Sequence, residues 1–529
     1  MKLRLATLFA VSLCACQSAE HESEAPSVPS SALLAPALRR LSAVELEAAA
    51  SAVVGAPVAL SAALPPDARQ ADFSRNLAQT LDSQSASQLY DATRAAAEQL
   101  DFTRAPFPSC AAHAAATDSA CQRELVSALS VRAFRRSATE AELSRLLALF
   151  SAGAETGSFR DGALLVARAL LGAPQFLYET HLGDAAASAG RVRLSEDELA
   201  SSLAFLISGA PPDDELLTAA RSGKLSNPDE RRAQAARLVG KPNSTALFQR
   251  FIGEWLGLVR LPGLAKDSSV TQDFAPLSAA MQLETQAFVD DVLHSSGGSL
   301  QMLFAGGFSR VPDALAPLYG IRAPGLAQRV SLRAVSRVGI LQQGSFLSVF
   351  AHEAESAPVL RGKAVLTRLL CRTVPAPQEL GIDVVPPAPD PKATTRKRFE
   401  RHVSDPLCAT CHASLDPVGF AFENFDAIGR LRTAEVGQPI DTRGSVLLDG
   451  ATLSVADSVA LSEAIAQSSD LRSCAARQVL RFAAGKPDSA AEDAFVAEVA
   501  TLPVEWRDSL LGLFLQFVSS DLFAWRKAE

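Results

Sequence analysis

Residues 405–426 read DPLCATCHASLDPVGFAFENFD and place Cys408, Cys411 and His412 within five residues of one another. The C-x-x-C-H spacing is that of c-type haem attachment. On one turn of a helix, thiols three residues apart reach the two vinyl groups of one porphyrin, and the next residue presents its imidazole to the iron. We therefore predict one covalent haem c on Cys408 and Cys411, with His412 as the proximal iron ligand.

Two other chemistries compete for these residues. A zinc ion would need Cys408, Cys411 and two further ligands from the remaining cysteines or His402, but structural zinc sites usually show a second closely spaced ligand pair, which the sequence lacks. A redox disulfide between Cys408 and Cys411 would not need His412, and no thioredoxin-like βαβ pattern surrounds the motif. Haem attachment is the favoured interpretation.

The N-terminus, MKLRLATLFAVSLCACQSAE, has the order of a secretory signal. Two basic residues precede an apolar run that is too short to be a stable membrane anchor, and small residues follow it. Residues 13–16 (LCAC) resemble a bacterial lipobox, which implies cleavage before Cys16 and acylation of its sulfur; an ordinary cleaved signal is the alternative. We expect an exported protein of the periplasm or cell surface, held as an outer-membrane lipoprotein.

The other cysteines are expected to form disulfides, because the exported compartment is oxidising. Four remain once those of the signal and of the motif are set aside, and four thiols allow three pairings. The expected pairs are Cys110 with Cys121 and Cys371 with Cys474. A bond that closes about a hundred residues contributes roughly 4–5 kcal/mol in the chain-entropy model.

The composition is that of a large globular protein. The chain has 529 residues, 48% of them hydrophobic and 20% charged, so several subdomains are expected rather than one core. The formal net charge of −8 disfavours a nucleic-acid partner. The sequence also lacks a G-x-S-x-G elbow and a phosphate-binding glycine loop.

Helical periodicity dominates the chain, and alternation at period two is scarce. Helix starts are expected at the capping boxes Ser42/Glu45, Thr139/Glu142 and Ser195/Glu198, at Asn227 before Pro228, and at Asp213 and Asp214. The fold class predicted is mainly α, with multi-helical subdomains, few short strands and a C-terminal cytochrome c-like haem domain.

Composition shifts divide the chain into predicted segments. These are a signal (1–15), a flexible tether (16–36), an N-terminal helical domain (37–103), a helical domain with Cys110 and Cys121 (104–185), a central helical domain (186–325), the haem-attachment domain (326–435) and a C-terminal helical domain (436–529). The proline-rich stretch 374–392 is expected to be extended and to lead into a short basic helix before the motif.

Strings along nearly the whole mature chain resemble the planctomycete-type cytochrome c-like family, built from five domains of unknown function: DUF1587, DUF1595, DUF1592, DUF1588 and DUF1585. The strings that carry the resemblance, in that order, are LRRLSAVELEAAASAVVG; VRAFRRSATEAELSRLLALF with LLGAPQFLYETHLG; RLSEDELASSLAFLISGAPPDDELL with RFIGEWLGL; ESAPVLRGKAVLTRLLC with CATCHASLDPVGFAFENFDAIGRLR; and CAARQVLRFAAGK. The resemblance implies a secreted or surface haem protein but no particular reaction. Members often carry Met where this chain has Leu415.

The sixth iron ligand is left open between three kinds of group. His352 is the leading distal candidate, since imidazole suits iron. Met281 and Met302 are alternatives, although both fit a core role better. Water or an open site is the third option. His402 is expected at the haem edge or on a propionate.

Residues flanking the motif are expected to shape the haem site. Asp416, Pro417 and Gly419 would set the backbone beneath the haem, since proline fixes φ and glycine permits close approach. Three phenylalanines would wall the porphyrin or be ordinary core, and Arg361 would hold a propionate or form a surface ion pair. The phenylalanines are Phe420, Phe422 and Phe425.

These observations predict electron transfer or haem-dependent oxidoreduction by an exported haem protein, with a redox partner protein or a quinol. Two other functions are kept. One is a surface binding or scaffold protein with a structural haem, because more than 300 residues precede the motif; a polysaccharide-related surface complex is its expected partner. The other is a peroxidase- or oxygenase-like enzyme.

Overall fold

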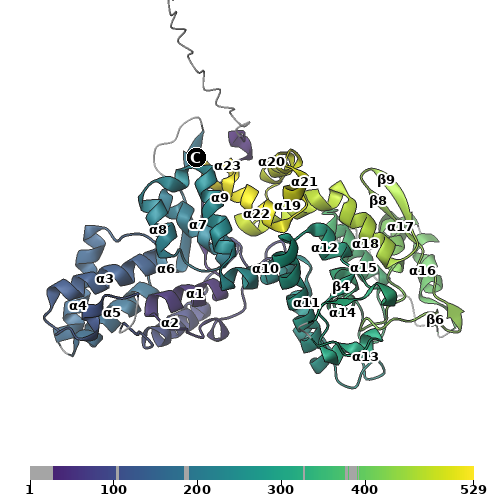
Figure 1. The fold of residues 1–529 in the computed structure, drawn as a ribbon, viewed down its shortest axis with the longest axis horizontal. Coiled ribbons are helices and arrows are strands. Elements are labelled where there is room, and N and C mark those ends of the chain that lie inside the picture. The colour runs from purple at the N-terminus through teal and green to yellow at the C-terminus, as the bar shows by residue number, and fades with distance from the viewer. Residues whose placement is uncertain are drawn as a thin grey trace, which may run out of the picture.

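The computed structural model describes residues 28–102, 106–155, 157–183, 190–325, 328–375, 379, 390, 392–404 and 406–528. The protein is mainly helical with few short strands, as the periodicity predicts. Figure 1 shows an elongated molecule, with α3, α4 and α5 at one end, α16 and α17 at the other, and α10 near the middle. The predicted signal, with Cys14 and Cys16, lies outside the described residues.

One end of the molecule is built on its own hydrophobic core, which we call the N-terminal core and define as the buried apolar residues between Leu41 and Leu177 together with Phe205. Its helices are α1 (Ala43–Val54), α2 (Ser83–Ala97), α3 (Ser119–Phe134), α4 (Glu140–Glu155), α5 (Phe159–Leu171) and α6 (Pro174–Leu177). Inside it, the rings of Phe150 and Phe159 meet edge to face at 5.0 Å. The segments predicted as 37–103 and 104–185 therefore share a single core.

A second, larger hydrophobic core, the main core, runs from Leu33 to Ala524 in sequence. Its first helices are α7 (Glu196–Ser208), α8 (Asp214–Arg221), α9 (Pro228–Val239), α10 (Pro242–Trp255), α11 (Ala275–Ser296), α12 (Leu300–Ala305), α13 (Ala316–Tyr319), α14 (Gly344–Val349), α15 (Pro358–Ala364) and α17 (Pro406–Phe420). Helix α16 (Thr395–Ser404) packs on α17. The last helices of the main core are α18 (Ser458–Gln467), α19 (Ser469–Ala484), α20 (Ser489–Ala500), α21 (Val504–Arg507), α22 (Leu510–Ser519) and α23 (Asp521–Ala524). The C-terminal helices therefore complete the core that the central segment begins.

The predicted helix starts are confirmed. Ser42 and Ser195 each accept the backbone N–H three residues on, and the glutamate at that position reaches back to the N-cap. Thr139 and Glu142 exchange the same bonds. Asn227 caps α9 ahead of its proline, and Asp213 caps α8. These signals are local, because each is complete within four residues, so the sequence alone suffices to find them.

The strands form two-stranded antiparallel ladders within the described residues. The pairs are β1 (Ala37–Arg40) with β2 (Tyr178–His181), β3 (Arg191–Arg193) with β10 (Trp525–Lys527), β4 (Phe308–Ser309) with β5 (Val330–Ser331), β6 (Ala434–Glu435) with β7 (Gln438–Pro439), and β8 (Gly444–Leu448) with β9 (Ala451–Val455). The β3–β10 ladder joins the last described strand to the segment just before α7.

Buried ion pairs lie where the N-terminal core meets the C-terminal helices. Arg39 is fully buried and donates to Glu45 (2.7 Å) and to Glu179. Arg75, 1% exposed, donates to the carbonyl oxygen of Phe482 in α19. Because a buried charge is tolerated only when paired, these contacts fix how the two parts of the molecule join.

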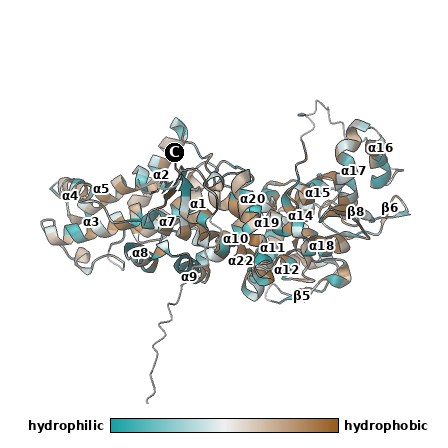
Figure 2. Cartoon of the chain, turned by 90° about the horizontal axis from the view of Figure 1, so that it is seen from above, coloured by the Kyte–Doolittle hydropathy of each residue, from teal (hydrophilic) through white to brown (hydrophobic). Residues whose placement is uncertain are grey.

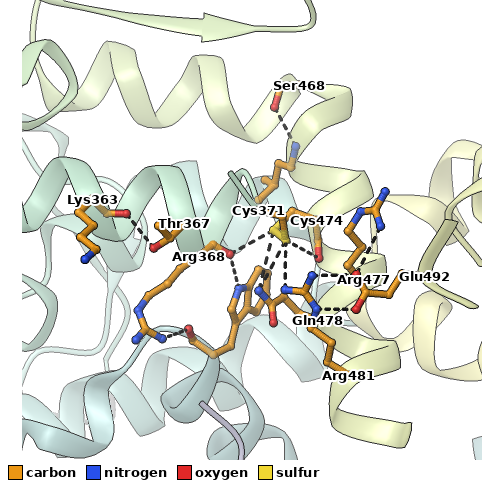
Figure 3. Close-up of a disulfide and its surroundings, with 12 residues drawn as sticks. Lys363, Thr367, Arg368, Cys371, Ser468, Cys474, Arg477, Gln478, Arg481 and Glu492 are labelled. Atoms are coloured by element: carbon orange, nitrogen blue, oxygen red, sulfur yellow. Dashed lines mark hydrogen bonds and ion pairs between the residues drawn. A yellow bond between two sulfur atoms is a disulfide. The ribbon is translucent and has the colours of Figure 1, made fainter. Parts of the chain in front are cut away.

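Both predicted disulfides are present. Cys110 is bonded to Cys121 at the start of α3, and Cys371 is bonded to Cys474 in α19. Figure 3 shows the second bond packed among polar side chains, with Arg481 Nη1 3.9 Å and Gln478 Nε2 3.6 Å from the sulfur of Cys371. This bond attaches the segment just before the proline-rich stretch to the C-terminal helices. Most of residues 374–392 lie outside the described part of the chain.

Candidate functional site: the CxxCH helix

The C-x-x-C-H motif lies on helix α17, and the basic helix predicted before it is α16. In Figure 2, the hydrophilic turns of α16 stand at one end of the molecule beside α17. Cys408, Cys411 and His412 are each half-buried. Positions three and four apart share one face of a helix, so the two thiols and the imidazole are presented on the same side of α17.

Helix α17 is held against α15 by glycine on both partners. A Cβ on Gly419 would collide with the carbonyl oxygen of Pro358, and a Cβ on Gly362 would collide with the carbonyl oxygen of Leu415. The prediction that Gly419 permits a close approach is correct, but the approaching group is the backbone of α15. The orientation of α17 is therefore fixed by backbone-to-backbone contact.

His412 is hydrogen-bonded to a carboxylate on its own helix. Its Nδ1 lies 2.9 Å from Oδ1 of Asp416, four residues on. The Asp416 side chain is 1% exposed, whereas that of His412 is 21% exposed. A carboxylate accepts hydrogen bonds, so the proton of the neutral ring belongs on Nδ1 and the lone pair on Nε2. Nε2 is the nitrogen that a metal can then take.

These residues fit a covalent haem. Cys408 and Cys411 are thiols rather than a disulfide, and His412 has its second ring nitrogen engaged by Asp416, which is how metal-binding imidazoles are usually held. The second oxygen of Asp416, Oδ2, is buried and has no hydrogen-bond partner among the described residues. The bond to His412 is therefore the polar contact through which this carboxylate can influence the site.

The competing interpretations lose support in the structure. Cys408 and Cys411 are not joined by a disulfide in the structure. For zinc, Cys371 and Cys474 are consumed by their mutual bond. Within the described part of the chain, no three His, Cys, Asp or Glu side chains form a group that could hold a metal ion. The side chain of His402 lies outside the described residues.

The candidates for the sixth ligand differ in their surroundings. Met281 is fully buried in α11 and accepts a contact from Ser348 Oγ at 3.6 Å, so it belongs to the main core. Met302, in α12, packs against the same core. His352 is exposed in a turn closed by the Ala351–Ser356 bridge. Its role as distal ligand stays a prediction.

The turn that carries His352 is tied to the helices of the motif. Glu355 pairs with Arg398 of α16 at 3.0 Å, and Ser356 donates to Glu423 at 3.0 Å, just beyond α17. The turn thus lies beside both helices. Among the described residues, no hydrogen bond or ion pair joins the imidazole of His352 to α17, and its role as distal ligand is not tested by these contacts.

The prediction for Arg361 is wrong. Its side chain is fully buried and donates to four backbone carbonyl oxygens, those of Leu347, Phe422, Phe425 and Asp426, at 2.7–3.2 Å. Burial lowers the pKa of Arg361 to about 10. The guanidinium therefore neither forms a surface ion pair nor offers a donor pair to a propionate. It ties α15 to the loop that follows α17.

The three phenylalanines after the motif are core residues, which is the plainer of their two predicted roles. Phe422 packs against Phe346, with ring centroids 6.2 Å apart. Phe425 lies under the guanidinium of Arg337, 4.8 Å from its ring centroid. Phe420 packs against side chains of α16. They anchor the end of α17 to the main core and to α16.

A buried polar cluster beyond Phe425 was not predicted. Glu284 in α11 is fully buried and accepts hydrogen bonds from Tyr319 and from Ser309 (2.8 Å). Arg337 stacks on Tyr319 at 3.8 Å. Burial raises the pKa of Glu284 to about 7, although the two hydroxyls act in the opposite direction. No local motif marks this cluster, because its members come from separate parts of the chain.

An open groove of about 760 Å³ lies away from the motif, between α1, α3, α7, α8 and α10. Small residues and prolines form most of its walls, and Arg132 and Arg250 border it. Cys408, Cys411 and His412 are not among its lining residues. Separately, among the described helices, none combines the length and apolarity needed to cross a bilayer.

Three domain families match the chain. Residues 121–181 match PSD5, a protein of unknown function (DUF1595); residues 194–321 match PSD4, a protein of unknown function (DUF1592); and residues 337–435, which contain the motif, match PSCyt3, a protein of unknown function (DUF1588). The three matches support the assignment to the planctomycete-type family. DUF1587 and DUF1585 at the two ends stay predictions. No curated protein and no solved structure matches the chain.

Proposed function

We propose that this chain is an exported c-type haem protein that works in electron transfer or haem-dependent oxidoreduction. Cys408 and Cys411 would hold one haem covalently through thioether bonds, and His412 would bind its iron. The observation that carries the proposal is the placement of both thiols and the imidazole on one side of α17, with Nδ1 of His412 already engaged by Asp416.

Each residue has a distinct task in this proposal. A haem held by these residues would supply one-electron chemistry or peroxide chemistry. Cys408 and Cys411 fix the position of the porphyrin, and His412 donates Nε2. The close contacts at Gly362 and Gly419 hold α17 against α15, since a Cβ at either glycine would collide with the backbone of the other helix.

The compartment and partner follow from the same proposal. The signal-like N-terminus and the lipobox-like LCAC support a location in the periplasm or at the cell surface, where the protein would be tethered through Cys16. The redox partner would be another protein or a quinol. The disulfides Cys110–Cys121 and Cys371–Cys474 suit such an oxidising compartment.

Expression of the full chain with a bacterial cytochrome c maturation system tests the proposal. The purified protein should show a Soret band, a c-type pyridine haemochrome spectrum and a mass increase of one haem. Cys408→Ala with Cys411→Ala should abolish covalent attachment. Ser414→Ala, on the same helix, should leave it intact. A full chain that stays colourless when a control cytochrome matures in the same cells would refute the proposal.

A further inference from the structure

We propose that Asp416 is a positioning residue that controls the donor strength of His412. Its carboxylate keeps the imidazole proton on Nδ1, presents the Nε2 lone pair to the haem and thereby stabilises the ferric over the ferrous state. This inference rests on the proposed function, since it concerns the regulation of the same site. The role proposed for Asp416 predicts that the haem has a low reduction potential. Its partner would therefore be a strongly reducing electron donor.

The geometry of the pair is set by the backbone of one rigid helix. His412 and Asp416 are four residues apart, which brings their side chains together on one face of α17. Gly362 and Gly419 hold that helix to α15, and a Cβ on Gly444 of β8 would collide with the carbonyl oxygen of Pro417. The 2.9 Å contact between Nδ1 and Oδ1 therefore does not depend on a mobile loop.

The surroundings of Asp416 direct its charge towards His412. The side chain is 1% exposed, so water screens it little. Its second oxygen, Oδ2, is buried without a hydrogen-bond partner among the described residues. Its one ion-pair contact in the described part of the chain is with His412. A carboxylate left with a single polar neighbour makes a strong, charge-assisted hydrogen bond to it.

The consequence for the ligand follows from general metal-site chemistry. A carboxylate on the distal ring nitrogen makes an imidazole more basic towards the metal and fixes its orientation. A stronger donor favours the higher oxidation state of iron and lowers the reduction potential. Axial ligands and the hydrogen bonds behind them are the means by which proteins set haem potentials. Asp416 is thus placed to select which partners can reduce the site.

The first test uses the haem-free full chain, so it does not depend on haem attachment. Nitrogen-15 NMR of histidine-labelled protein reports which ring nitrogen carries the proton, and His412→Ala identifies the signal among the seven histidines. We expect Nδ1–H in the wild-type chain and in Asp416→Asn, whose amide oxygen still accepts the bond. Asp416→Leu should shift His412 to mostly Nε2–H. An Nε2–H tautomer in the wild-type chain would overturn the inference.

The second test measures the midpoint potential of the haem-loaded chain. Asp416→Asn should raise the potential, because a neutral amide is a weaker acceptor than a carboxylate. Glu423→Gln is the matched control: Glu423 is another buried carboxylate close to α17, but it bonds Ser356 and Arg432 instead of His412. Glu423→Gln should raise the midpoint potential less than Asp416→Asn does, because it removes a negative charge near α17 without changing the hydrogen bond to His412.

Failure of the proposed haem binding and failure of the proposed role of Asp416 would give different experimental results. A wild-type chain that never acquires haem contradicts the proposed function, while the NMR result still decides the tautomer. A loaded chain whose Asp416→Asn potential equals that of the wild type, or rises no more than that of Glu423→Gln, contradicts the role of Asp416 and leaves haem binding intact. A purely structural role for Asp416 would change the unfolding curve without changing the tautomer.

Discussion

The carbonyl oxygen of Pro358 occupies the space that a side chain on Gly419 would need. This contact joins the first turn of α15 to the last turn of α17, at the opposite end of α17 from Cys408. The position of the motif relative to the main core therefore depends on two backbones touching. Several consequences of this and of the other contacts can be measured.

Gly419→Ala should destabilise the protein by about 1–3 kcal/mol, because the added methyl group forces α17 away from α15. Gly263→Ala is the control, since a Cβ there meets no atom within 4 Å. It should change the free energy of unfolding by less than about 0.5 kcal/mol. Urea unfolding of both variants gives the comparison. Equal effects would show that the α15–α17 contact is not tight in solution.

Loss of the long-range disulfide should cost more stability than loss of the short one. The bonded cysteines are 103 residues apart for Cys371–Cys474 and 11 apart for Cys110–Cys121. The chain-entropy model gives about 4.7 and about 2.8 kcal/mol, respectively. Double alanine variants, compared by denaturant unfolding, measure the difference. The reverse order would mean that local packing at Cys110 and Cys121 outweighs loop closure.

Glu284 should make the folded protein less stable as the pH rises from about 4.5 to about 7. Its folded pKa of about 7 lies above the ordinary glutamate pKa of 4.5, so the folded state holds the proton more tightly. That advantage is complete below the unfolded pKa and is lost through the folded pKa, by roughly 3 kcal/mol in total. Unfolding free energies of wild type and Glu284→Gln across this range give the difference. Parallel curves would contradict the prediction.

Glu45 should stabilise the folded protein at neutral pH, and this stabilisation should be lost as the pH falls. Burial alone would raise its pKa, but the charges of Arg39 and then Arg75 outweigh burial and lower it to about 2. Its stabilisation is therefore present above the unfolded pKa and is lost as the pH falls from about 4.5 towards 2, by roughly 3 kcal/mol.

Acid titration of tryptophan fluorescence tests this for Glu45→Gln. The variant should be less stable than wild type at pH 7 and should lose less stability on acidification. Glu140→Gln removes a carboxylate that pairs with Arg123 at the surface, with side-chain exposures of 83% and 52%, and should behave as wild type. If Glu140→Gln and Glu45→Gln titrate alike, the buried pair does not govern acid unfolding.

Cys16→Ser should abolish lipid incorporation, because acylation of Cys16 is the proposed anchor. Metabolic labelling with palmitate measures the lipid directly. Cys14→Ser is the control, because Cys14 would leave with the signal and its replacement should not change labelling. Palmitate incorporation into Cys16→Ser at the wild-type level would contradict the prediction.

What the sequence predicts well is what a few neighbouring residues decide. Helix starts such as Ser42 and Ser195 need only a hydroxyl and a glutamate three residues on. The disulfide pairing followed from the number and spacing of cysteines. The contact between His412 and Asp416 was within reach of the same reasoning, since residues four apart on a helix are neighbours. The sequence prediction gave Asp416 only a backbone role.

The sequence predicts poorly those features that depend on contacts between residues far apart in the chain. Arg361 has the appearance of a surface cation, yet four carbonyl oxygens from α14 and the loop that follows α17 surround it. Glu284 acquires its partners from the segments around Ser309 and Tyr319. The shared N-terminal core likewise joins segments that composition had separated. Long-range contacts of this kind leave no periodic trace in the sequence.

The β3–β10 ladder also sets the order of events during biogenesis. Trp525 is paired with Arg193, so the ladder cannot form until the final residues of the chain have been delivered. An exported chain crosses the membrane from its N-terminus, and the motif is delivered about a hundred residues before β10. On the proposed export route, Cys408 and Cys411 would therefore be delivered before β10. The β3–β10 ladder would close only after the residues proposed to hold the haem are already outside the cytoplasm.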